Sequence, residues 1–145
     1  MIDDLYQETI LDHSKRPRNL HAMADANRKA EGFNPLCGDK LRLYLKLEDD
    51  IVRDASFEGA GCAISTASAS LMTESLKGKT REEALKLMEK FHALVTTDTA
   101  ASNDLGKLVV FCGVRDYPAR VKCATLAWHT MKSALSGTGE TVTTE

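Results

Sequence analysis

The stretch of residues 41–48 constrains the fold of this chain more than any other segment. It reads Leu-Arg-Leu-Tyr-Leu-Lys-Leu-Glu, so that leucines alternate strictly with other side chains. Successive side chains of a β-strand point to opposite faces, and this period of two is typical of an antiparallel strand with one buried face. Asp49 and Asp50 predict a turn, and residues 51–57 form the expected returning strand of a hairpin.

Helical patterns lie on both sides of this hairpin. Thr80 and Glu83 form a capping-box sequence, and Pro118 stands where a first helical turn accepts proline. The expected helices cover residues 2–14, 63–76, 81–95 and 104–112, the last of these ended by Gly113, and a final segment of about 118–135. Residues 28–33 are a further candidate for a short edge strand.

This order of elements predicts an α+β fold. We expect a small antiparallel sheet of about three strands, packed against four to five helices. A length of 145 residues fits one domain, which we expect over residues 1–135. Residues 136–145, mostly Gly, Thr and Glu, are expected to form a flexible tail.

Charge and hydropathy exclude several classes of partner. The net charge is −2, and the chain carries no basic stripe of the kind that neutralises nucleic-acid phosphates. No apolar run approaches the length of a membrane span, and the N-terminus lacks the features of a secretory signal. We therefore expect a cytoplasmic protein that binds neither nucleic acid nor a membrane.

The chain has four cysteines, at positions 37, 62, 112 and 123. A disulfide framework is not expected in a reducing compartment or in a chain of this length. The remaining interpretations are buried core residues, a metal site or thiol chemistry. Cys112 follows the apolar run Val109 to Phe111, which favours a core position for it.

The other cysteines stand at turns and helix starts. Cys37 lies in a turn rich in Asn, Pro and Gly, with Asp39 two residues later, and Cys62 follows a glycine-bracketed turn at a strand-to-helix junction. Cys123 falls in the second turn of the last expected helix. If these segments meet at one end of the sheet, three thiolates and one carboxylate form a tetrahedral site that zinc accepts. Alternatively, Asp39 caps its local turn.

Histidines add no signal for a metal site. The four histidines, His13, His21, His92 and His129, are not clustered in the sequence, and we expect them to be solvated.

Three motifs, taken in order, resemble the U-type iron–sulfur cluster assembly proteins, which include IscU, SufU and the N-terminal domain of NifU. They are Asn-Pro-Leu-Cys-Gly-Asp at 34–39, Gly-Ala-Gly-Cys-Ala-Ile-Ser at 59–65 and Arg-Val-Lys-Cys-Ala-Thr-Leu-Ala-Trp at 120–128. The chain looks like the SufU type, because Lys122 stands where the IscU type has a histidine. Residues 117–120, Tyr-Pro-Ala-Arg, replace the chaperone-recognition stretch of the IscU type.

The resemblance implies an IscU/SufU-like fold and a role in iron–sulfur cluster assembly. It makes Cys37, Asp39, Cys62 and Cys123 the metal ligands. SufU-type members bind zinc there and accept persulfide sulfur from a SufS-like cysteine desulfurase, whereas IscU-type members assemble a [2Fe–2S] cluster for transfer to downstream proteins. The resemblance therefore implies a partner of a desulfurase rather than a free-standing enzyme.

Several details stay open at the level of sequence. We expect Cys37 to leave the metal and take the sulfur, with Cys123 as the alternative acceptor and Asp39 as a labile ligand. Arg120 and Lys122 either dock the partner or belong to a solvated helix face. A purely structural zinc in a binding module is the more remote alternative.

Overall fold

The computed structural model describes residues 4–35, 37–97, 103–137 and 141–143. The chain is α+β, as predicted. In chain order, the elements are α1 (Asp4–Lys15), β1 (Arg28–Asn34), β2 (Asp39–Glu48), β3 (Ile51–Ala60), α2 (Ala63–Leu76), α3 (Arg81–Thr96), the 3₁₀-helix η1 (Asn103–Asp116), α4 (Pro118–Ser136) and β4 (Val142–Thr143).

The sheet has the strand order β3-β2-β1-β4, in which β4 runs parallel to β1 and the other pairs are antiparallel. The prediction of about three antiparallel strands therefore missed one strand. β1 lies inside the sheet rather than at its edge, because Gly32 and Phe33 pair with Val142 and Thr143. These last two residues fall in the segment expected to be a flexible tail. An open strand edge offers unpaired backbone groups, which a nearby segment can satisfy.

The hairpin of β2 and β3 matches its prediction. Leu43 and Leu45 of β2 are fully buried, and both turn residues, Asp49 and Asp50, have positive φ, as tight hairpin turns require. Tyr44 departs from the alternation, because it is only 5% exposed although it shares the polar face. Its hydroxyl donates a hydrogen bond to the Glu58 carboxylate.

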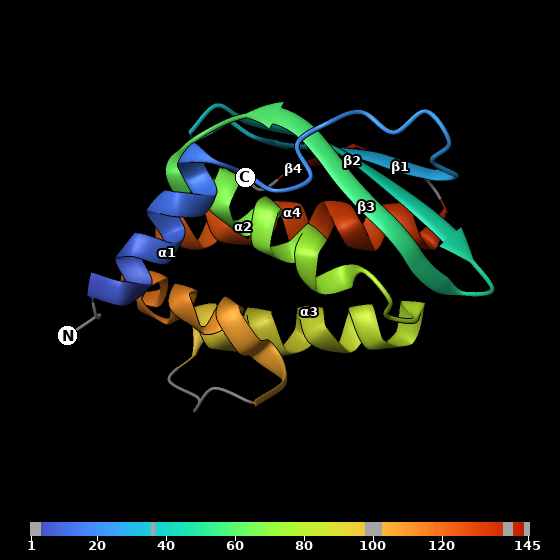
Figure 1. Ribbon diagram of the computed structural model, residues 1–145. Coiled ribbons are helices and arrows are strands. Elements are labelled where there is room, and N and C mark those ends of the chain that lie inside the picture. Colours follow the sequence, from blue (N-terminus) through green and yellow to red (C-terminus); the bar gives the residue numbers. More distant parts are fainter. Residues whose placement is uncertain (1–3, 36, 98–102, 138–140, 144–145) are drawn as a thin grey trace.

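The helices cover one face of the sheet in successive layers (Figure 1). α2 and α4 pack against the strands, and α3 with η1 packs on the far side of α4. A Cβ atom at Gly32 of β1 would lie 2.1 Å from the Oγ1 atom of Thr130, so glycine permits the close approach of α4 to the sheet. In the core, Trp128 of α4 stacks on Phe91 of α3 with 4.8 Å between ring centroids. None of the described helices is long and apolar enough to span a membrane.

Helix boundaries show one success and one error of prediction. The capping box of Thr80 and Glu83 is present at the start of α3. The helix predicted over 104–112 is instead the 3₁₀-helix η1, which continues through Gly113 to Asp116. Gly106, with φ 53° and ψ −128°, interrupts its helical backbone, and the tighter 3₁₀ winding suits short connectors between packed helices.

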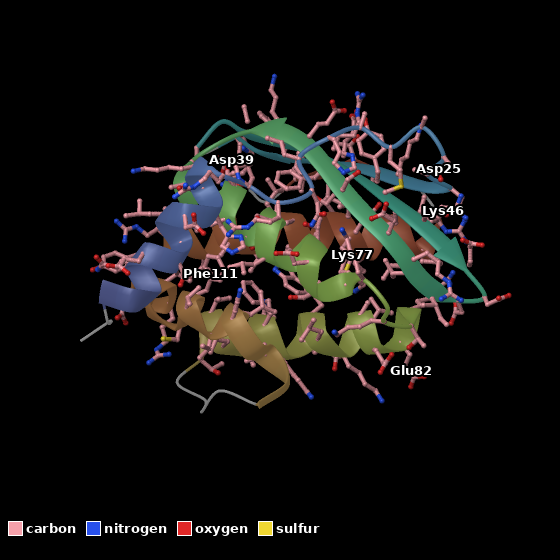
Figure 2. The ribbon with its side chains drawn as sticks, viewed as in Figure 1. Asp25, Asp39, Lys46, Lys77, Glu82 and Phe111 are labelled. Carbon is pink, nitrogen blue, oxygen red and sulfur yellow. The ribbon has the colours of Figure 1, made fainter. Side chains whose placement is uncertain are left out.

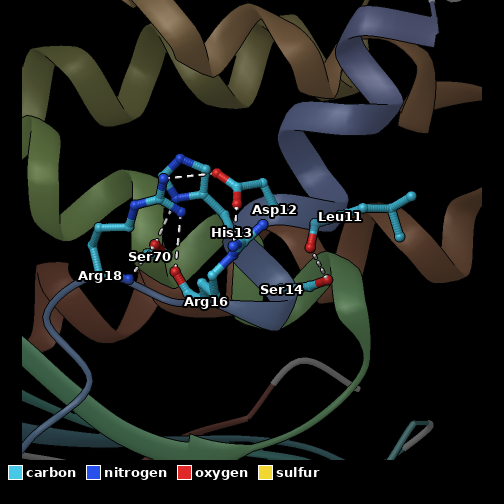
Figure 3. Close-up of polar contacts among 7 residues, drawn as sticks. All are labelled: Leu11, Asp12, His13, Ser14, Arg16, Arg18 and Ser70. Carbon is cyan, nitrogen blue, oxygen red and sulfur yellow. Dashed lines mark hydrogen bonds and ion pairs between the residues drawn. The ribbon is translucent and has the colours of Figure 1, made fainter.

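His13 of α1 is buried, so its expected solvation was wrong. It is 2% exposed, and its Nδ1 atom lies 2.7 Å from the Oγ atom of Ser70 in α2 (Figure 3). The same Oγ atom accepts a hydrogen bond of 2.9 Å from the backbone N–H of Arg18. Since Ser70 accepts this bond, its hydroxyl proton is free to bond the imidazole, and the contact joins α1 to α2.

Candidate metal centre

The four predicted ligand residues come from three places in the fold. Asp39 is the first residue of β2, and Cys37 lies in the turn before it, where Gly38 has a φ of 72°. Cys62 is the N-cap of α2, and Cys123 lies in the second turn of α4. Figure 2 places Asp39 at one end of the sheet, away from the Asp25 and Lys46 pair. These chain segments therefore converge on one end of the sheet.

The side chains meet closely enough to share an ion. Single donor atoms of Cys37, Asp39 and Cys123 all lie within 4.8 Å of one another. The Sγ atoms of Cys37 and Cys123 are 3.3 Å apart. Cys62 lies beside this group, with its Sγ atom 3.9 Å from the Oδ2 atom of Asp39.

The cluster of Cys37, Asp39 and Cys123 is compact enough to hold a metal ion such as zinc. Zinc–sulfur bonds of about 2.3 Å at tetrahedral angles separate two sulfur ligands by about 3.7 Å. The sulfurs of Cys37 and Cys123, 3.3 Å apart, are closer than that value, and the Sγ atom of Cys62 lies 3.9 Å from the Oδ2 atom of Asp39. Three thiols and one carboxylate are also a donor set that zinc or an iron–sulfur cluster accepts.

Hydrogen bonds hold the carboxylate of Asp39 in place. Its Oδ1 atom accepts a bond of 2.8 Å from the backbone N–H of Cys62. Its Oδ2 atom accepts a bond of 3.2 Å from the side-chain amide of Asn34. The cap of a local turn, proposed above as an alternative for Asp39, does not describe these contacts, because one of them reaches 23 residues along the chain. Asp39 is fully buried.

Burial raises the pKa of the Cys123 thiol, and its contacts with Cys37, Asp39 and Cys62 raise it further. The apolar surroundings and the neighbouring acidic groups outweigh the stabilisation that the start of α4 would give a thiolate at Cys123. The shift favours the protonated form of the Cys123 thiol, whose Sγ atom lies 3.3 Å from that of Cys37. Thiol and carboxylate groups gathered in this way are donors that a positive ion such as zinc accepts.

Gly61 is needed beside the site for steric reasons. A Cβ atom at this position would lie 2.5 Å from the Oδ1 atom of Asp39, which is closer than real side chains come. The glycine therefore lets the chain before α2 pass directly over the carboxylate and present the Cys62 N–H to it.

An open groove of about 510 Å³ runs beside the cysteines. Its walls are mainly apolar and come from α1, the start of α2, η1 and the start of α4. Residues that line it include Ile10, Leu11, Ile64, Val110, Val114, Tyr117 and Arg120, together with Cys37, Cys62 and Cys123. Leu11 and Tyr117 are 49% and 51% exposed, so the groove presents two large side chains to solvent.

The other candidate residues, Arg120, Lys122 and Cys112, lie in different surroundings. Arg120 lines the groove, and its guanidinium lies 4.5 Å from the centre of the Tyr117 ring. Lys122 is half-buried and is not among the groove residues. Cys112 packs half-buried against the core, as predicted, and is not in the ligand cluster of the described residues.

One residue of the site was missed from the sequence. Asn34 is fully buried at the end of β1 and donates to both Asp39 and Cys123, over 3.2 Å and 3.5 Å. Its position within the first cysteine motif was visible, but asparagine before proline is read first as a turn residue. Only the fold brings its amide to a ligand 89 residues away.

Comparison with known families identifies the family of this chain. Residues 5–124 match the family described as NifU-like N terminal domain. The chain belongs to this family. The match includes every one of the four predicted ligand residues, and it confirms the resemblance to U-type proteins.

Relatives of this NifU-like domain are named either as a sulfurtransferase or as scaffold proteins. The chain is 44% identical over 136 residues to the zinc-dependent sulfurtransferase SufU of Bacillus subtilis, covering 93% of this chain and 92% of the relative. It is 41% identical over 135 residues to the iron–sulfur cluster assembly scaffold protein IscU of Streptococcus pyogenes, covering 92% and 84%.

Solved structures share the fold. A proposed iron–sulfur cluster assembly scaffold protein for the SUF system, from Fervidobacterium islandicum AW-1, is 40% identical, with a TM-score of 0.84 over 88% of this chain and 94% of that one. A NifU-like protein from Brucella abortus reaches the same TM-score at 26% identity, over 93% and 94% of the two chains. The IscU/SufU-like fold predicted from the sequence is confirmed.

Proposed function

We propose that this chain is a zinc-binding sulfur acceptor in iron–sulfur cluster assembly. The observation that carries the proposal is the contrast between Cys37, which is exposed at the open groove, and Asp39 and Cys123, which are buried beside it. An exposed thiol next to buried ligands is a nucleophile that a partner can reach. The name of the Bacillus subtilis relative, a zinc-dependent sulfurtransferase, supports the same activity.

Zinc would be held by Cys37, Asp39, Cys62 and Cys123. When bound, it supplies a positive charge that keeps the thiols deprotonated near neutral pH. Such a charge would offset the raised pKa of the Cys123 thiol. A carboxylate holds zinc less firmly than a fourth thiolate, so Asp39 keeps the site exchangeable.

Sulfur transfer then follows ordinary thiol exchange. The Cys37 thiolate attacks the outer sulfur of a persulfide on the donor's cysteine, and a new sulfur–sulfur bond forms on Cys37. The sulfur–sulfur bond of the donor breaks, and its electron pair leaves with the donor's cysteine as a thiolate. No external oxidant or reductant is required. Cys123 is the alternative acceptor, but at 2% exposure it is far less accessible than Cys37.

The partner that fits this chemistry is a SufS-like cysteine desulfurase, with later assembly proteins receiving the sulfur. The groove supports docking of a partner segment, because it opens directly at Cys37 and exposes Leu11 and Tyr117. Arg120, which lines the groove, carries a positive charge that would attract the persulfide anion. Lys122 lies off the groove, so its docking role has less support. A cytoplasmic location remains a prediction.

A scaffold for a [2Fe–2S] cluster is the second candidate function. Thiolates are the usual ligands of such clusters, and the IscU scaffold of Streptococcus pyogenes is 41% identical to this chain. The absorbance of anaerobically purified protein separates the two functions. A colourless protein with one bound zinc supports sulfur acceptance, whereas a brown protein with visible bands supports the scaffold.

Mass spectrometry after incubation with a desulfurase and cysteine tests the acceptor assignment. We expect an adduct of one sulfur atom on the wild-type protein and on Cys112→Ser, the matched control for a cysteine outside the cluster. Cys37→Ser should lose the adduct. An adduct that survives in Cys37→Ser and disappears in Cys123→Ser would transfer the role to Cys123.

A further inference from the structure

We infer that Asn34 is a positioning residue that ties Asp39 and Cys123 together and so leaves Cys37 as the reactive ligand. The inference deepens the proposed function and rests on it. It concerns which thiol of the centre reacts, a choice that the ligand set alone does not make.

Asn34 is placed to contact two ligands at once. It is the last residue of β1, fully buried, and stands opposite Asp39 in the register of the sheet. Its Nδ2 atom lies 3.2 Å from the Oδ2 atom of Asp39 and 3.5 Å from the Sγ atom of Cys123. A side-chain amide nitrogen carries two N–H donors, one for each of these acceptors.

The hydrogen bonds to the four ligands are distributed unevenly. Asp39 accepts from both Asn34 and the Cys62 backbone. The Sγ atom of Cys62 accepts from the backbone N–H of Ser65, over 3.4 Å. Cys123 accepts from Asn34.

Cys37 differs from the other three. Within the part of the chain that the structure describes, its thiol receives a hydrogen bond only from Cys123. It is exposed, and it precedes Gly38, whose positive φ marks the tight turn. Among the four candidate ligands, Cys37 is therefore the one that hydrogen bonds from the described residues restrain least.

This difference has a chemical consequence. An N–H bond to a thiolate stabilises the charged sulfur and makes it a weaker nucleophile. Residues that bond to metal ligands also fix their orientation, and losing one typically costs about 10- to 100-fold in metal affinity or activity. Asn34 therefore restrains Cys123 and Asp39, and the attack on an incoming persulfide is left to Cys37.

Timed alkylation followed by peptide mapping tests the role of Asn34. Asn27→Ala is the matched control, because Asn27 lies just before the other end of β1 and its side chain bonds the backbone of Leu47. Wild type and Asn27→Ala, both loaded with Zn²⁺, should react with iodoacetamide at Cys37 well before Cys123. In Asn34→Ala, the rate at Cys123 relative to Cys37 should rise by about 10-fold or more.

A purely structural role predicts a different pattern. If Asn34 only stabilises the fold, the buried Cys123 reacts through unfolding and the exposed Cys37 does not, so the ratio of Cys123 to Cys37 should rise no more than the unfolded fraction measured by urea titration. A ratio in Asn34→Ala that is unchanged, or that rises no more than this fraction, overturns the inference. Should Asn34→Ala fail to fold, Asn34→Ser replaces it, because serine keeps one hydrogen-bond donor. The ratio of the Cys123 rate to the Cys37 rate is then expected to rise by a smaller factor.

The alkylation measurement also separates this inference from the proposed function. Alkylation needs no desulfurase, and it is repeated on metal-free protein, in which Asn34 contacts Cys123 over 3.5 Å. Failure to bind zinc or accept sulfur would count against the proposed function. Equal ratios of the Cys123 rate to the Cys37 rate in wild type and Asn34→Ala, with and without zinc, would count only against the role inferred for Asn34.

Discussion

The Sγ atom of Cys123 lies 3.3 Å from the Sγ atom of Cys37, although 86 positions separate the residues in sequence. The two thiols differ sharply in accessibility, since Cys37 is exposed and Cys123 is 2% exposed. Their pairing joins the turn before β2 to the second turn of α4. It places an exposed sulfur against a buried one, which is the contrast on which the proposed function rests.

Oxidation should convert this contact into a disulfide in metal-free protein. Mild oxidation by diamide is expected to link Cys37 with Cys123, with loss of two hydrogens by mass and a cross-linked peptide on mapping. Bound zinc should block the reaction, because both sulfurs are then ligands. Cys112→Ser should behave like wild type, and a bridge to Cys112 would contradict the proximity described here.

Zinc removal should lower stability without unfolding the domain. The apolar core, which includes Leu43, Phe91 and Trp128, forms a continuous cluster that does not depend on the ligands. Zinc at a thousand times its Kd stabilises the native state by about 4 kcal/mol, which corresponds to a fall in Tm of about 10 °C or more on chelation. Calorimetry with and without chelator checks this. Cooperative unfolding on chelation at 25 °C would favour the structural zinc instead.

Replacing Gly61 should weaken metal binding more than it weakens the fold. In Gly61→Ala, the new Cβ would meet the Oδ1 atom of Asp39 at 2.5 Å, so the carboxylate must move. We expect zinc affinity to fall by about 10-fold or more. Competition with a chromophoric chelator measures the affinity, and the Tm of the metal-free variant is the control. An affinity equal to wild type would show that the carboxylate is not held in the bound form.

His13 should make stability depend on pH. Burial lowers the pKa of His13, and Arg18 lowers it further. Nearby Asp12 and Glu74 oppose this shift, and Lys107 adds to it. Below the ordinary histidine pKa of about 6.5, the unfolded chain therefore binds more protons than the folded one, so stability falls as pH decreases from 7. The loss levels off once the pH is below the pKa of the folded state.

Urea unfolding at a series of pH values tests this linkage. His13→Asn should show a shallower loss of stability between pH 7 and 5 than wild type. Part of the dependence of stability on pH should remain in His13→Asn, because burial also lowers the pKa of His129. The double variant His13→Asn/His129→Asn should show a still smaller dependence. A slope unchanged by His13→Asn would exclude His13 as a source.

Local sequence signals predicted much of the fold and most of the site. The alternation of Leu41 to Leu47 and the Thr80 capping box depend on neighbours in sequence, so they survive into the structure unchanged. Cys37, Asp39 and Cys62 were visible because turns and helix starts have recognisable compositions.

The missed features depend on tertiary contacts. The pairing of β4 with Gly32, the burial of His13 against Ser70 and the reach of Asn34 to Cys123 all join segments far apart in sequence. No local pattern encodes such partners. Gly106 also carries no signal that separates an interrupted 3₁₀-helix from an ordinary one.

The centre draws on both halves of the chain, and this has a consequence during synthesis on the ribosome. A nascent chain that ends after α3 already holds Cys37, Asp39 and Cys62 but lacks Cys123. Protein synthesis proceeds at about 5–20 residues per second, so these groups wait several seconds for α4 to emerge and dock. The four candidate ligands can therefore meet only after the chain has been made through α4 and has folded around it.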